Sequence, residues 1–140
     1  MNEEANWKQR LSNANLHPLH KLLNIEIVAL GDGHAVVHSM PEAKFENVMG
    51  RMHGGYIASI LDAVMGSAVA TKVPGGLSFG TVDLNAKYVR KIEVATGKLI
   101  ATANVIHAGR SLLTVEARVA DEAGKLYAHG SGTFMVYPKQ

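Results

Sequence analysis

The chain has 140 residues, enough for one sizeable hydrophobic core and too few for two ordinary domains, so we expect a single domain over residues 1–140. Its formal net charge of +2 and its scattered Lys and Arg residues argue against a nucleic-acid surface. The absence of cysteine excludes disulfides, thiolate metal sites and a cysteine nucleophile. The first ten residues carry acids and a Trp where a signal peptide needs a basic end and an apolar run, so we expect a soluble cytoplasmic protein.

The first third of the chain predicts short helices followed by two strands. Residues 2–13 have a helix-forming composition, and a second helical turn is expected after Pro18, a residue favoured in the first turn of a helix. Residues 25–29 and 34–40 are β-prone and are separated by Gly-Asp-Gly, which indicates a hairpin. Residues 41–52 follow neither period, and we expect a loop there.

One long helix is predicted from about Gly54 to Lys72, closed by the Pro-Gly-Gly turn that follows. It has the length of a membrane span, but its Asp62, serines and glycines are unusual in one, so a buried helix and no membrane partner are expected. The small residues of this helix are expected to face closely packed strands. They are Ala58, Ser59, Ala63, Gly66, Ala68 and Ala70.

From residue 77 onward the hydrophobic pattern has period 2, which predicts strands at 78–90, 98–109, 111–122 and 125–137. We expect these four strands to form an antiparallel meander. The order of elements predicts α+β architecture, in which a sheet curls around one central helix.

A specific motif spans the loop and the start of the long helix. The string N-x2-G-x2-HGG-x6-D is carried by Asn47, Gly50, His53 to Gly55 and Asp62. It resembles the signature of hotdog-fold acyl-CoA thioesterases, and most of all the PaaI-type branch of phenylacetate degradation. The resemblance extends over nearly the whole chain. It implies a hotdog fold with about six strands, dimers that commonly pair into tetramers, and hydrolysis of a thioester to a carboxylate and free coenzyme A without a metal or other cofactor.

The residues themselves support an acyl-transfer site. Backbone N–H groups at Gly54 and Gly55 begin the predicted helix, where they can donate to a developing oxyanion, and the missing side chains let a substrate carbonyl approach. Asp62 is the only carboxylate between residues 50 and 71, and it lies roughly 12 Å further along the same helix. One helix cannot close such a site. We therefore predict a composite site at a dimer interface, in which two antiparallel helices meet across a two-fold axis and bury each Asp62.

The roles of three residues in the motif stay open at this stage. Asp62 can act as general base on a water or as a nucleophile that forms a mixed anhydride, and its alternative is a purely structural acid. By the resemblance, His53 orients the substrate carbonyl; its alternative is a helix cap. Asn47 can donate its amide N–H to the same carbonyl, and its alternative is a turn residue.

The strand after the helix supplies further polar candidates. By the resemblance, the Thr81 hydroxyl holds the water or the attacking carboxylate; the alternative is a Thr that merely suits a strand. Asp83 and Asn85 alternate with Thr81, so all three are expected on one face, and Asp83 is a second candidate acid.

Several residues are candidates for binding the two parts of an acyl-CoA substrate. Arg90, Lys91 and Arg110 are candidates for the phosphates of coenzyme A. Tyr56, the nearby Met49 and Met52, or the N-terminal helix are expected to line an acyl pocket for a medium-chain or aromatic group.

Histidines do not predict a metal site. His34 and His38 would lie ~13 Å apart along one strand, too far for one ion. His17 and His20 can share a helical face, but no third ligand is apparent.

Two other classes remain as alternatives to a thioesterase that forms homodimers or homotetramers. A hydroxyacyl-CoA hydratase or dehydratase has the same fold, but the HGG-x6-D string argues against it. A non-catalytic acyl-CoA-binding module would keep the pocket and would not need Asp62.

Overall fold

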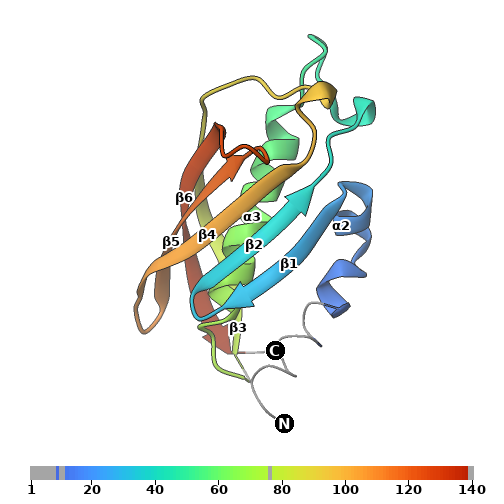
Figure 1. Cartoon of the computed structure of the whole chain (residues 1–140). Helices are drawn as coiled ribbons and strands as arrows, with labels where there is room; N and C mark the ends of the chain where they lie inside the picture. The colour runs from blue at the N-terminus through green and yellow to red at the C-terminus, as the bar shows by residue number, and fades with distance from the viewer. Residues whose placement is uncertain (1–8, 10–11, 76, 139–140) are drawn as a thin grey trace.

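An antiparallel six-stranded sheet wraps around one long helix in the computed structural model of the chain (Figure 1). The structure describes residues 9, 12–75 and 77–138. The elements, in chain order, are α2 (Pro18–Leu22), β1 (Ile25–Gly31), β2 (His34–Ser39), the 3₁₀ turn η1 (Ala43–Phe45), α3 (Gly54–Ala70), β3 (Leu77–Tyr88), the 3₁₀ turn η2 (Val94–Thr96), β4 (Leu99–Ala108), β5 (Leu112–Ala120) and β6 (Leu126–Pro138). The expected α+β architecture around a central helix is confirmed.

The order of strands in the sheet is β1-β2-β4-β5-β6-β3. Only β4, β5 and β6 form a meander, whereas β3 pairs with β6 at the far edge of the sheet. The expected four-strand meander was therefore wrong. Period-2 alternation shows that a segment is a strand but not which strand it pairs with, and residues 89–98 carry the chain from the edge strand β3 to β4 in the centre of the sheet.

Helix α3 has one face against the sheet and one face open. The large apolar residues Tyr56, Ile57, Ile60, Leu61, Val64, Met65 and Val69, together with Ala68, are buried against the sheet. A second set of residues is half-exposed and makes up what we call the open face of α3: Ala58, Ser59, Asp62, Ala63, Gly66, Ser67 and Ala70. The small residues, Ala68 excepted, therefore do not lie buried against the strands as expected, because the large side chains fill the space beneath the sheet.

Within the described residues, no helix combines the length and apolar character that crossing a bilayer requires.

The N-terminal segment packs along the edge strand β1. The side chain of Asn15 accepts a hydrogen bond from the backbone N–H of Ile27 over 2.8 Å and donates one to its carbonyl over 3.0 Å. Residues 12–15 are helical, while most of the helix predicted over residues 2–13 lies outside the described residues. Short helix α2 follows and contacts β1. Residues of α2 and of the open face of α3 line a common cavity.

The predicted hairpin between β1 and β2 is confirmed, and it fixes the C-terminal end of α3. Its turn residue Gly33 has a φ of +71° and donates its N–H to Oγ1 of Thr71 over 2.7 Å. In the same turn, Asp32 pairs with Lys72 over 2.9 Å. Both contacts hold the end of the helix against the hairpin.

Leu61 tests how far packing against the sheet stabilises α3. Its side chain is fully buried, so Leu61→Ala leaves a cavity and should lower the free energy of unfolding by about 2–5 kcal/mol. Val48→Ala, at a fully exposed loop position, should change it by less than about 0.5 kcal/mol. Urea unfolding at equal protein concentration measures both values, and equal midpoints would contradict this packing.

Candidate active site

Asp62 lies near the middle of α3 on its open face, where Thr81 of β3 holds its carboxylate. The Thr81 hydroxyl donates a hydrogen bond to Oδ1 of Asp62 over 2.8 Å. Among the described residues, Oδ2 has no hydrogen-bond donor. A single protomer leaves Asp62 half-exposed rather than buried, because the open face of α3 points away from the sheet. Burial of this acid therefore requires a second surface.

A bulge in β3 decides which polar side chains face the helix. Thr81 pairs with Phe134, which is buried, and the register then shifts so that Asp83 pairs with Thr133. The extra residue, Val82, moves Asp83 to the outer face of the sheet, where its Oδ1 accepts the N–H of Thr133 over 3.0 Å. The expectation that Asp83 and Asn85 share a face with Thr81 was wrong, because a bulge reverses the alternation of faces.

The start of α3 is capped by His53. Its Nδ1 accepts the N–H of Gly55 over 2.8 Å, so this second donor of the predicted oxyanion site is used within the cap. The N–H of Gly54 has no acceptor among the described residues. The carbonyl of Gly54 accepts the hydroxyl of Tyr88 over 2.8 Å, which ties the helix start to β3. In the part of the chain that the structure describes, the N–H of Gly54 is thus one backbone donor left available at the N-terminal end of α3.

Asn47 organises the loop in front of α3. Its Oδ1 accepts the N–H of Met49 over 2.9 Å, and its own N–H donates to the carbonyl of Arg51 over 2.8 Å. This is the geometry of a turn residue. Among the described residues, the side-chain N–H₂ of Asn47 has no acceptor, so it can still donate to a ligand.

A cavity of about 380 Å³ at the N-terminal end of α3 brings together several of the predicted residues. Asn47, Gly54, Arg90 and Lys91 line it, and Arg51 is a third cation there. Sequence reasoning missed Arg51, although it stands inside the motif, because the loop geometry that turns it toward the cavity has no sequence signal. Three cations around one cavity can bind phosphate groups.

Arg110 lies elsewhere. It is in the turn between β4 and β5. At the start of β5, Leu112 pairs with Met135 of β6, and Met135 pairs on its other side with Gly80 of β3. Arg90 follows the other end of β3, and Gly80 and Tyr88 alone are roughly 26 Å apart along the strand. The structure of one protomer therefore does not bring Arg110 to the other two cations.

Tyr56 belongs to the core of the protomer. It is 5% exposed, and its ring stacks on Phe45 with a centroid distance of 4.6 Å. Its hydroxyl hydrogen-bonds Ser39, and burial raises the pKa of this hydroxyl above its ordinary value. Of the two methionines proposed beside it, Met52 is buried and Met49 is exposed.

Asp62 and the cation-lined cavity are separate sites on one chain. Asp62 lines two other cavities, of about 340 and 300 Å³, on the open face of α3. Since Gly54 and Asp62 belong to one continuous helix, they are held roughly 12 Å apart. Among the described residues, no three His, Asp or Glu side chains are grouped so that they could hold a metal ion.

Comparison with solved structures defines the class of fold. A conserved protein of Pseudomonas aeruginosa is 34% identical, with a TM-score of 0.82 over 89% of this chain and 98% of that one. The PaaI protein of the E. coli phenylacetic acid degradation operon has a TM-score of 0.85 over 96% of this chain and 94% of that one, at 23% identity, which shows a shared fold. The hotdog fold expected from the resemblance is confirmed.

The family follows from sequence comparison. The model of the Thioesterase superfamily matches residues 49–128, which include the HGG-x6-D motif and Thr81. A 1,4-dihydroxy-2-naphthoyl-CoA hydrolase of Listeria monocytogenes is 29% identical over 87% of this chain and 98% of the relative. The chain belongs to the thioesterase superfamily and is a thioester hydrolase.

The cap at His53 can be tested apart from the chemistry. His53→Ala should lower the free energy of unfolding by about 0.5–2 kcal/mol, because the N–H of Gly55 loses its acceptor. His53→Asn supplies another capping oxygen, so both its free energy of unfolding and its thioester turnover should be close to those of the wild type. Urea unfolding and thiol release measure the two quantities. If stability returns in His53→Asn while turnover stays lost, the imidazole does more than cap the helix.

Proposed function

We propose that this chain is an acyl-CoA thioesterase that cleaves medium-chain or aromatic acyl-CoA to a carboxylic acid and coenzyme A, with Asp62 as the reacting carboxylate. The observation that carries the proposal is the hydrogen bond of 2.8 Å from Thr81 to Asp62 on the open face of α3. It orients one carboxylate oxygen and leaves the other available for a water or a carbonyl carbon. Once a second chain covers this face, an acid with only a structural role would need partners for both of its oxygens.

Two routes of hydrolysis fit this arrangement. In the first, Asp62 takes a proton from a water whose oxygen attacks the thioester carbonyl; collapse of the intermediate breaks the C–S bond, and the thiolate receives the proton. In the second, Asp62 itself attacks, the thiolate leaves, and water hydrolyses the mixed anhydride. In both routes an oxyanion forms, and the N–H of Gly54 is suited to stabilise it, with the amide of Asn47 as a second donor.

The active site is completed by a second copy of the chain. Gly54 and Asp62 on one helix are too far apart to act on one carbonyl. β3 is an edge strand of the described sheet, so its outer backbone groups are free to pair with another chain. A two-fold axis beside β3 would set two α3 helices antiparallel and bring Asp62 of each protomer to the partner's Gly54. Dimers of this kind are the unit from which a homotetramer would form.

The substrate class rests on two cavities. The cation-lined cavity at the start of α3, with Arg51, Arg90 and Lys91, suits the phosphates of coenzyme A. If Arg110 takes part, the partner protomer contributes it. The cavity of about 340 Å³ beside Asp62 is near the lower end of small-ligand pockets, roughly 300–1,000 Å³, which favours a medium-chain or aromatic acyl group. Similarity to a hydrolase named for an aromatic acyl-CoA supports the same class.

The catalytic role of Asp62 is tested by Asp62→Asn, which keeps the shape and removes the charge. Turnover of a panel of acyl-CoAs, followed with a free-thiol reagent, should fall by about 10²-fold or more. Asp83→Asn is the matched control, because Asp83 follows closely on Thr81 but faces away from α3. Equal losses in the two variants would contradict the proposal. Binding without thiol release by the wild type would indicate a binding module, and hydration without thiol a hydratase.

Shared sites are tested by mixing two inactive variants. Gly54→Pro deletes the proposed oxyanion donor at a first-turn position where helices accept Pro, and the extended backbone of His53 (φ −60°, ψ 138°) suits a residue before Pro. Refolding it together with Asp62→Asn should restore about a quarter of wild-type activity, because half of the dimers are mixed and each mixed dimer has one intact site. Activity that stays absent in mixed dimers confirmed by mass would show that each site lies within one chain.

A further inference from the structure

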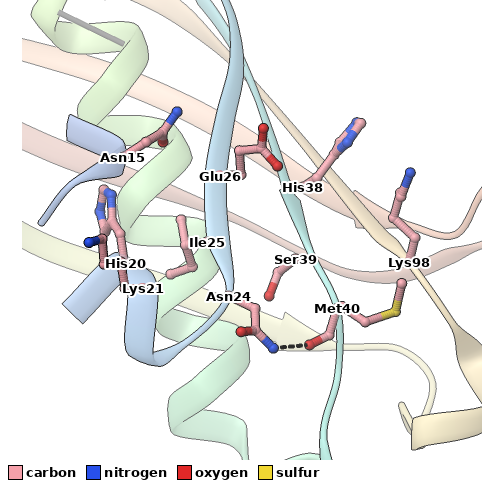
Figure 2. Close-up of a pocket in the computed structure, with 10 residues that line it drawn as sticks. All are labelled: Asn15, His20, Lys21, Asn24, Ile25, Glu26, His38, Ser39, Met40 and Lys98. Atoms are coloured by element: carbon pink, nitrogen blue, oxygen red, sulfur yellow. Dashed lines mark hydrogen bonds between the residues drawn. The ribbon is translucent and has the colours of Figure 1, made fainter. Parts of the chain in front are cut away.

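His20 of α2 lies where three cavities of the protomer meet. It lines both cavities that Asp62 lines, and it also lines a larger cavity of about 540 Å³ that extends to the outer side of β1. Figure 2 shows this third cavity, with His20 and Lys21 extending from α2 on one side of β1 and with His38 and Lys98 on the other side. No other described residue lines all three cavities.

The two cavities beside Asp62 share only three of the described residues in their walls: His20, Asp62 and Ala63. Asp62 and Ala63 belong to α3, so His20 is the one shared wall residue contributed from across the cavities. The first cavity continues toward the C-terminal half of α3 and ends against Leu30, Phe79 and Phe134. The second continues toward the N-terminal half of α3 and is lined by Leu19, Ile25 and Leu84. Both are bounded mainly by apolar side chains, as an acyl chain requires.

Histidine is an unusual residue in the mainly apolar walls of these two cavities. Burial lowers the pKa of His20 below its ordinary value, so the ring is neutral near pH 7 and can lie against an apolar chain. Its Nδ1 is buried and has no hydrogen-bond partner among the described residues. An unpaired buried nitrogen does not favour folding. A hydrogen bond to the backbone of Ala14, which opposes this lowering of the pKa, holds the ring in the wall.

We propose that His20 determines acyl-chain specificity, because its ring separates the two cavities beside Asp62 and confines the acyl group to the one that ends at Phe79 and Phe134. This inference rests on the proposed thioesterase function. A chain that fits the cavity of about 340 Å³ would be accepted, and a longer one would meet the ring of His20 instead of continuing into the second cavity. Removal of the ring joins the two spaces and lengthens the chain that the site accepts.

The test compares variants of one side chain on a series of straight-chain acyl-CoAs. In His20→Ala, the ratio of kcat/KM for long to short chains should rise about tenfold or more, because several additional methylenes find space. In His20→Leu, which keeps most of the volume and removes the unpaired nitrogen, the ratio should stay near that of the wild type. His20→Trp should lower it. His17→Ala is the matched control, since His17 is on the same segment, its ring centre is 6.4 Å from that of His20, and it lines none of the three cavities.

Equilibrium binding of the same acyl-CoAs gives a second measurement that does not depend on turnover. Each change at His20 is placed in the Asp62→Asn background, and the chain-length profile of Kd should move in the same direction as that of kcat/KM. Unchanged profiles in folded His20→Ala and His20→Trp, or an equal shift in His17→Ala, would overturn the role of His20. A wild type that binds acyl-CoA but releases no thiol would overturn the hydrolase proposal and leave the binding profile to decide about His20.

Discussion

The rigid helix α3 keeps Gly54 and Asp62 apart within one protomer. The N–H of Gly54 and the carboxylate of Asp62 belong to a single run of 17 helical residues, and hydrogen bonds along it fix their separation. Contacts at both ends add to this: the cap at His53, and the hydrogen bond from Gly33 to Thr71. A backbone donor and a carboxylate that cannot approach each other within one chain can still meet when two such helices lie side by side in opposite directions.

The distribution of side chains around α3 makes such an approach possible. The sheet covers only one side of the helix, and the large apolar residues are all directed to that side. What remains is a face of Ala, Gly and Ser with Asp62 in its middle, where small side chains allow another helix to come close. The same feature keeps the protomer incomplete, because nothing among the described residues covers this face fully. Large residues on one side of α3 stabilise the protomer, and small residues on the other side leave Asp62 accessible.

The sequence predicts the helices, the strands and the motif residues well, but it predicts less well how they are placed relative to one another. Period-2 alternation locates β3 to β6, the β-prone runs around Gly-Asp-Gly locate β1 and β2, and the uncharged run closed by Pro-Gly-Gly locates α3. The HGG-x6-D motif points to Gly54 and Asp62 as candidate site residues. The pairing of β3 with β6, the bulge at Val82 and the position of Arg51 depend on contacts between residues far apart in the chain, for which local patterns carry no signal. The position of His20 is the hardest to predict, since the two histidines near α2 do not indicate that one ring lines the same cavities as Asp62.

The bulge in β3 has a chemical consequence as well as a geometric one. Without it, strict alternation would direct Asp83 toward the same side as Thr81, and two carboxylates would face the helix. Like charges close together oppose each other's ionisation, and a general base or a nucleophile must be ionised to act. With the bulge, Asp83 binds the backbone of Thr133 on the outer face, and Asp62 is the one acid among the described residues that line the cavities of the open face. One additional residue in an edge strand thus separates a structural carboxylate, Asp83, from Asp62, the carboxylate that we propose reacts.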